Sequence, residues 1–279
     1  MRLRTSVGRS VGTAVAAAAV VVATAPAALA SAPGLAAVAL SERGHSLVAL
    51  TTDEPGDTAP IGLIKGYGLG DTLLVGIDHH PRTGALVGVG DGGGIYRVDA
   101  GTAALTRIGC LTVPLDGRFF GVDVDPAANA LRIVSDTGQN LRHPFTGTSD
   151  VPALTTVEDA PLDREGISGV AYTGSAHVFG VDTIADRLVA VGPSGDVTGL
   201  GEPGELGDLV GSAGLDIHTA TTPDGTRDSA FAVVRRPGMP LLLAVDLADG
   251  TASRIGRFDI DVVDLAVVPA AEPAEEGTP

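Results

Sequence analysis

The chain has 279 residues and a formal net charge of −16, with 34 acidic against 18 basic side chains. An acidic surface of this kind repels phosphate backbones and anionic lipid head groups, so nucleic acid and anionic membranes are poor partners. Thirty-nine Gly and 18 Pro in a chain that is still 44% hydrophobic indicate short strands joined by tight turns, not a disordered chain. The single cysteine, Cys110, excludes an internal disulfide.

The first thirty residues have the composition of a secretory signal peptide. Three arginines come first, an apolar run follows at 11–25, and the small-x-small triplet at 28–30 is typical of a cleavage site. The run is shorter than the roughly 20 apolar residues that span a bilayer, and Pro26 interrupts it. We therefore expect residues 1–30 to be removed, leaving a secreted, extracellular protein without a membrane span. Its 15 basic and 34 acidic side chains would give a net charge of −19.

Three short apolar segments follow the predicted signal peptide, at 37–40, 45–51 and 60–64. Turn residues separate them, as in an antiparallel sheet. They are typical of the second, third and fourth strands of a four-stranded unit whose first strand is missing.

A six-residue motif then recurs five times and decides the fold prediction. It begins at Gly76 (GIDHHP), Gly121 (GVDVDP), Gly169 (GVAYTG), Gly214 (GLDIHT) and Val262 (VVDLAV). Successive motifs start 45, 48, 45 and 48 residues apart. This period matches the roughly 40 to 50 residues of a four-stranded propeller blade, so five motifs predict five blades.

Each motif opens a run of strand-like segments, and no window of helical length shows a helical period. After the first motif, four short apolar segments are separated by turn residues: 76–80, 85–90, 95–99 and 104–109. The last motif leaves no room for three further strands, so we expect it to complete the N-terminal unit. The sequence thus predicts a single all-β domain at 31–269, a five-bladed β-propeller closed by the C-terminal strand joining the N-terminal blade. A disordered acidic tail is expected at 270–279.

Two segments resemble the recurring sequences of DUF4394, a secreted bacterial family of unknown function. They are FGVDVDPAANALR at 120–132 with VSDTGQNLR at 134–142, and LVGIDHHPRTGAL at 74–86, where the family usually has Phe in place of His79. The resemblance covers roughly residues 36–268 and implies an exported, bacterial, propeller-like protein. It implies no catalytic residues, so it supplies no enzymatic activity.

The motif places four aspartates at one position of the innermost strand, with Ala171 at the fifth: Asp78, Asp123, Asp216 and Asp264. In a radial arrangement these carboxylates would ring the channel and raise one another's pKa unless something compensates their charge. Calcium, which prefers oxygen ligands, would do so, and these four residues are therefore a candidate metal site. Alternatively, each aspartate accepts backbone N–H bonds from the neighbouring turn and keeps its blade in register, the commoner role of such residues.

A second cluster gathers guanidinium and amide groups on one predicted hairpin: Arg132, Asp136, Gln139, Asn140 and Arg142. Such a cluster could bind the carboxylate or phosphate of a ligand. Equally, residues 136–138 form a turn, and the arginines could pair with the aspartate ring or with an adjacent blade. The sequence leaves both interpretations open.

No motif of a serine hydrolase or a zinc protease occurs in the sequence. We therefore expect a non-enzymatic binding or scaffold protein for an extracellular ligand or protein. One alternative is a hydrolase acting on glycans or lactones with channel carboxylates as acid and base, although the scarcity of aromatic residues, 3% of the chain, counts against sugar binding. The other is a calcium-dependent structural domain.

Overall fold

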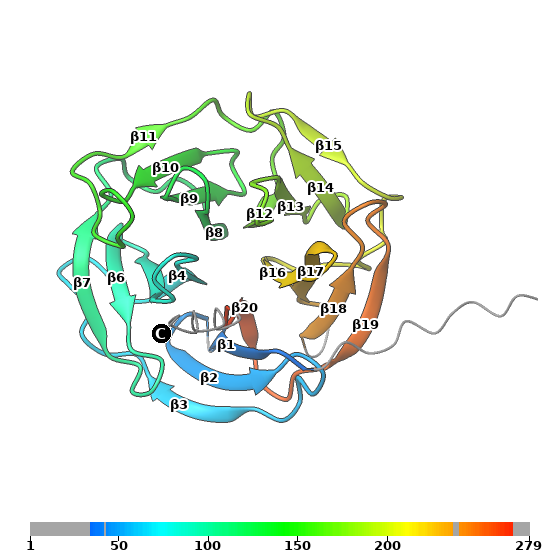
Figure 1. Ribbon diagram of the computed structural model, residues 1–279, viewed down its shortest axis with the longest axis horizontal. Helices are drawn as coiled ribbons and strands as arrows, with labels where there is room; N and C mark the ends of the chain where they lie inside the picture. Colours follow the sequence, from blue (N-terminus) through cyan, green and yellow to red (C-terminus); the bar gives the residue numbers. More distant parts are fainter. Residues whose placement is uncertain (1–33, 42, 237–239, 270–279) are drawn as a thin grey trace, which may run out of the picture. The chain divides into compact units, whose positions relative to one another are not determined.

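The computed structural model of the protein describes residues 34–41, 43–236 and 240–269. These residues form twenty strands and contain no helix, and hence no helix that could cross a bilayer. The strands form five four-stranded antiparallel sheets arranged in a ring (Figure 1). The predicted five-bladed propeller is confirmed. The predicted signal peptide and acidic tail lie outside the described residues.

Four of the sheets each follow one stretch of the chain, from an inner strand to the rim (Figure 1). The second sheet contains β4 (Leu74–His79), β5 (Leu86–Gly90), β6 (Gly94–Val98) and β7 (Leu105–Cys110). The third contains β8 (Phe120–Asp125), β9 (Ala130–Ser135), β10 (Asn140–Pro144) and β11 (Val157–Glu158). The fourth contains β12 (Ile167–Tyr172), β13 (Val178–Asp182), β14 (Arg187–Val191) and β15 (Val197–Gly199). The fifth contains β16 (Ala213–Thr222), β17 (Gly225–Val234), β18 (Leu241–Val245) and β19 (Ala252–Arg257).

The first sheet joins the two ends of the domain. Its inner strand is β20 (Val262–Val267), followed by β1 (Ala36–Ser41), β2 (Ser46–Thr51) and β3 (Ala59–Leu63). In the antiparallel pairing of β20 with β1, Ala37 lies opposite Val267. The ring is therefore closed by hydrogen bonds between distant parts of the chain. This confirms the prediction that the last motif completes the N-terminal unit.

Close packing of the inner strands explains the glycine that opens the motif. A Cβ atom added to Gly121 would lie 2.6 Å from the backbone nitrogen of Val170, on the inner strand of the next sheet. One added to Gly214 would lie 2.6 Å from a carboxylate oxygen of Asp264. Side chains at these positions would push neighbouring blades apart, so the glycines set the tight inner circumference.

Aliphatic side chains fill the space between neighbouring sheets. Between the second and third sheets, for example, Val87, Val89 and Ile95 pack with Leu131 and Ile133, and all five are fully buried. Burial of such side chains stabilises the fold by about 1.5–3 kcal/mol each. Because the chain has no Trp and few other aromatic residues, aliphatic side chains must fill most of the core.

Candidate functional site

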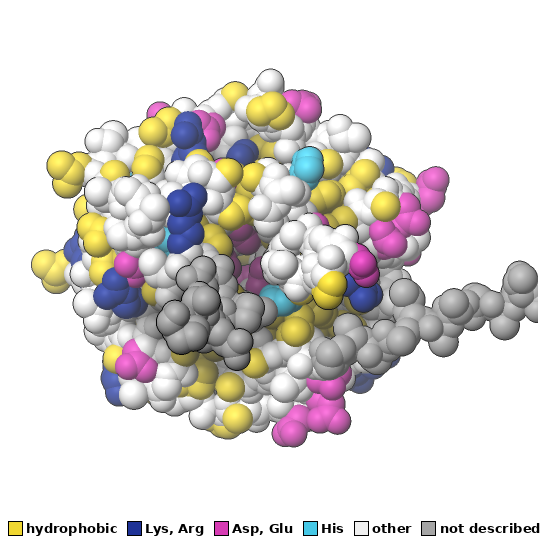
Figure 2. All heavy atoms as spheres, in the orientation of Figure 1, with side chains coloured by type: hydrophobic (Ala, Val, Ile, Leu, Met, Phe, Trp, Pro, Cys, Tyr) yellow, Lys and Arg dark blue, Asp and Glu magenta, His cyan; other side chains and the backbone are white. Residues whose placement is uncertain are grey.

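A cavity of about 450 Å³ opens at the end of the channel where the inner strands finish. Its walls include Asp78 and His79 from β4, Asp123 from β8, Tyr172 from β12 and Asp216 from β16. Figure 2 shows a hollow at the centre of the ring with acidic side chains inside it. We call this the acidic cavity. Its volume lies within the range of small-molecule sites.

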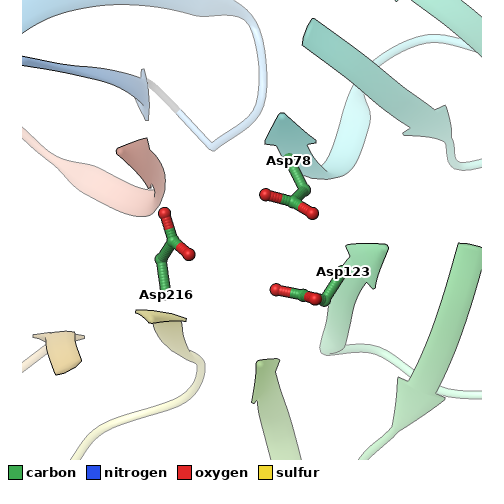
Figure 3. A group of neighbouring side chains, drawn as sticks. All are labelled: Asp78, Asp123 and Asp216. Atoms are coloured by element: carbon green, nitrogen blue, oxygen red, sulfur yellow. The ribbon is translucent and has the colours of Figure 1, made fainter. Parts of the chain in front are cut away.

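Three of the four predicted aspartates meet in this cavity (Figure 3). Asp78, Asp123 and Asp216 each place a carboxylate oxygen within 4.8 Å of the other two, and each side chain belongs to a residue that is at most 8% exposed. We call these residues the acidic triad. Asp264 is also buried, but it does not belong to this group.

Backbone N–H groups of neighbouring sheets hold all four carboxylates in place. The donor and acceptor atoms are Val124 N to Asp78 Oδ2 at 2.8 Å, Tyr172 N to Asp123 Oδ1 at 3.3 Å, Val267 N to Asp216 Oδ2 at 2.5 Å, and Ile77 N to Asp264 Oδ2 at 3.0 Å. Each aspartate therefore fastens its inner strand to the next one around the ring. The alternative to a metal site predicted that each aspartate accepts bonds from the neighbouring turn. The four bonds given above come instead from the inner strand of the next sheet.

Burial makes ionisation of the triad unfavourable. It raises the pKa of Asp216 from 3.8 to about 6. It also raises the pKa values of Asp78 and Asp123 well above their usual range, and the charges of the neighbouring aspartates add to both shifts. Among the described residues that line the cavity there is no lysine or arginine to compensate. The triad must therefore retain protons or take up a positive charge from outside.

The geometry of the triad suits a cation. Calcium binds oxygen atoms at about 2.3 to 2.6 Å, so two ligands of one ion lie up to about 5 Å apart. The 4.8 Å limit of the triad falls within this span. Within the described parts of the chain, it is the one group of three or more His, Cys, Asp or Glu side chains that satisfies this limit.

Two histidines contribute to the wall of the acidic cavity without adding positive charge. His79 and His218 both line it, and burial lowers the pKa of each, which favours neutral rings at pH 7. The Nδ1 atom of His79 lies 3.2 Å from the carbonyl oxygen of Gly84, while its buried Nε2 has no hydrogen-bond partner in the described part of the chain.

A long hairpin forms one side of the acidic cavity. Strands β16 and β17 have ten residues each, whereas the other inner strands have six. The extension brings Thr219, Thr221 and Thr226 into the cavity wall. This hairpin was not predicted, although Asp224-Gly225 between two polar, Thr-rich segments is a recognisable hairpin signal. The extension makes this blade unlike the other four and places the difference beside the triad.

The arginines of the second predicted cluster lie on neighbouring strands of the third sheet. Arg132 on β9 is buried and donates from Nη1 to the hydroxyl of Tyr172 at 3.1 Å. Arg142 on β10 forms a two-bond ion pair with Asp159, at 2.8 and 3.0 Å. Both guanidinium groups thus have partners inside the protein.

The other three members of this cluster support nearby loops. Asp136 Oδ1 accepts a bond from the backbone of Arg118 at 2.9 Å. The side chain of Gln139 accepts from Asp116 N and donates to Pro114 O, and Asn140 donates to Ala160 O. None of the five predicted residues lines the acidic cavity. Their ligand-binding role stays a prediction. Of the two arginines, Arg132 contacts an adjacent blade through Tyr172, as the alternative interpretation expected, whereas Arg142 pairs with Asp159 beside its own sheet.

Several solved structures are similar to this chain at low sequence identity. A protein of unknown function from Bacteroides thetaiotaomicron has a TM-score of 0.51 and 14% identity, over 84% of this chain and 64% of its own. An auxiliary nutrient binding protein from the same organism has a TM-score of 0.42 and 14% identity, over 71% of this chain and 53% of its own. TolB from Acinetobacter baumannii has a TM-score of 0.47 and 14% identity, over 85% of this chain and 54% of its own.

The chain thus spans less than two-thirds of the length of each of these structures. The first likeness concerns the fold alone. No curated protein matches the sequence. The model of a domain of unknown function, DUF4394, matches residues 46–266, from the second strand of the first sheet into the strand that closes the ring. The protein belongs to the DUF4394 family.

Proposed function

We propose that the protein is a non-enzymatic, extracellular binding propeller that holds the cationic group of a small ligand in its acidic cavity. The observation that supports this proposal is the acidic triad, three buried carboxyl groups with no lysine or arginine among the described residues that line the cavity. A bound cation would relieve both the desolvation cost and the mutual repulsion of these groups.

The surroundings of the triad also favour binding. The carboxylates are fixed by backbone bonds from three different inner strands, so little conformational freedom remains to be lost when a ligand arrives. Thr221 and Thr226 line the same cavity and offer hydroxyl groups to the rest of a ligand, whereas the hydroxyl of Thr219 already accepts from Gly174 N and donates to Asp228. This combination of a charged floor and a polar wall is typical of a site that orients its ligand.

A calcium ion is the second candidate, because the three carboxylates lie close enough to bind one ion together. They would supply part of the six to eight oxygen ligands that calcium takes, with water or a ligand supplying the remainder. In this case the ion would tie three blades to one another and stabilise the ring.

Isothermal titration calorimetry separates these two candidates. Protein lacking residues 1–30 is titrated at pH 7 with calcium chloride, with putrescine and, as an uncharged counterpart, with butane-1,4-diol. If the proposal is right, putrescine binds with measurable heat, and the diol binds at least tenfold more weakly. Binding of calcium without putrescine supports the structural ion instead. Absence of binding by either cation would refute both.

Matched variants test whether the triad is the site. Asp123→Asn removes one carboxyl group from the triad, while Asp264→Asn removes a buried carboxyl group at the same repeat position outside it. Binding should weaken at least tenfold in the first and stay within about twofold in the second, because only the first loses a charge-assisted contact. Thermal melts confirm that both variants are folded. If polysaccharides or lactones are turned over and Asp123→Asn abolishes this, the site belongs to a hydrolase and the binding proposal is wrong.

A further inference from the structure

A second cavity of about 640 Å³ lies at the opposite ends of the inner strands, where they begin. Leu74 of β4, Phe120 of β8 and Val263 of β20 form part of its wall. It is separate from the acidic cavity, and the two share no lining residue. We call it the basic cavity.

The charged side chains of the basic cavity are mostly arginines. Among the described residues that line it, one is an acid, Asp261, and four are arginines: Arg43, Arg118, Arg235 and Arg236. This concentration of positive charge occurs in a protein with a net charge of −16. Four arginines around one cavity create a positive local potential, and this potential attracts anions.

Two of the four arginines already have partners within the protein. Arg235 forms an ion pair with Asp261 at 2.9 Å, and Arg236 donates from Nε to the carbonyl oxygen of Leu206 at 3.1 Å. Arg43 and Arg118 are exposed and form no ion pair with any residue in the described ranges. Their guanidinium groups thus have donors to offer to a ligand, each in a planar fork that suits carboxylate or phosphate oxygens.

Both residues lie in loops next to strands of the ring. Arg43 lies in the tight turn between β1 and β2 and has a φ of 59°. Arg118 precedes β8, and Asp136 Oδ1 accepts hydrogen bonds from the backbone nitrogens of both Arg118 and Phe119, at 2.9 and 3.3 Å. The guanidinium carbon of Arg118 lies 5.4 Å from the centre of the Phe119 ring. Asp136 thus acts here as a positioning residue for the loop.

Apolar side chains supply the rest of the basic cavity. Phe119, Phe120, Val210 and Val263 all line it. An inorganic anion would leave these surfaces in contact with water, whereas an anion attached to an apolar body would cover them. The chemistry of the wall therefore points to a ligand with both parts.

We propose that the basic cavity binds a small organic anion, a carboxylate or phosphate attached to an apolar body, with Arg43 and Arg118 contacting the anionic group. This site is independent of the cation site proposed for the acidic cavity. Its occupancy would give the propeller a ligand at each end of the channel.

Titration calorimetry with naphthalene-2-carboxylate and 2-naphthyl phosphate tests this proposal and distinguishes the two anionic groups. At least one of them should bind at least tenfold more tightly than the uncharged naphthalene-2-carboxamide and than inorganic phosphate. Binding should also weaken when salt is raised from about 50 to about 500 mM, because screening reduces the attraction of exposed charges. Equal affinity for the anion and its amide would overturn the proposal.

Single substitutions locate the site. Arg118→Gln and Arg43→Gln should each weaken binding about tenfold, the effect of one lost charge-assisted hydrogen bond. Arg254→Gln makes the same change of charge at an exposed position on the outer strand β19 and should leave binding unchanged. Equal weakening in all three variants would reveal a non-specific charge effect and refute the site.

The Asp123→Asn variant keeps the two proposals distinguishable. It should leave binding of the naphthyl anions unchanged, since Asp123 does not line the basic cavity. If an acidic peptide binds with the expected arginine dependence while both naphthyl anions fail, the cavity is a protein-binding site and the small-molecule proposal is wrong.

Discussion

Replacing Asp216 by Asn should change how the stability of the protein depends on pH. The folded state raises the pKa of Asp216 from 3.8 to about 6, chiefly through burial. Between these values the folded protein holds a proton that the unfolded chain has released. Stability is therefore lost as pH rises from about 4 to about 6, and the loss then stays constant. The loss amounts to about 3 kcal/mol, from 1.36 kcal/mol for each pKa unit.

The asparagine variant escapes this loss, because its amide has no proton to release. The difference in unfolding free energy between variant and wild type should shift by about 3 kcal/mol in favour of the variant between pH 4 and pH 7. For a domain of this size the shift corresponds to about 6 to 12 °C in melting temperature. Relief of the repulsion that Asp216 exerts on Asp78 and Asp123 acts in the same direction.

Urea unfolding in the presence of a chelator, followed by circular dichroism at four pH values, measures this difference directly. The comparison with wild type cancels the contributions of other carboxylates, including Asp91, whose hydrogen bonds lower its pKa and give the opposite slope. Asp57→Asn, at an exposed position, serves as the control and should show no shift. A constant difference between Asp216→Asn and wild type across this range would refute the reasoning.

Four further substitutions test the packing of the ring and the predicted cluster around Arg132 and Arg142. Gly121→Ala should destabilise the protein by about 1–3 kcal/mol in thermal melts, because the new methyl group would meet the backbone of Val170. Gly101→Ala is the control and should melt almost normally, because the atom nearest to its new methyl group would be 3.4 Å away. Equal melting temperatures for the two glycine variants would contradict the tight inner circumference. Arg142→Ala should cost at most about 1 kcal/mol, because its ion pair is partly exposed, and Arg132→Ala, which removes a buried side chain, should cost more. Loss of ligand capture by Arg142→Ala at unchanged stability would instead show that the predicted hairpin cluster binds the ligand.

The repeat carried most of the information about the fold. A motif spaced at the length of one blade predicts the number of sheets, and its unpaired last copy predicts how the ring closes. The strands observed in the second sheet differ from the predicted segments by one or two residues at their ends. Such prediction succeeds because the same turn and strand signals recur in every unit.

The sites were less predictable, because they depend on how separate sheets pack together. Four aspartates share one position in the repeat, yet Asp264 bonds to the residue before Asp78, while Asp78 bonds to the residue after Asp123. This offset separates Asp264 from the triad and leaves no trace in the sequence. The basic cavity was invisible for a similar reason, since Arg43, Arg118 and Arg235 come from three distant segments that only the folded ring brings together.

The pairing of β20 with β1 has a consequence for refolding. Because it joins residues as far apart as Ala37 and Val267, it must wait until the intervening sheets have been drawn into place. Until then the molecule is an open arc, with an unpaired edge on β1 and an unattached strand at the other end. A second molecule presents the same strand, so refolding from concentrated solution favours strand-exchanged oligomers, and dilution favours closed monomers.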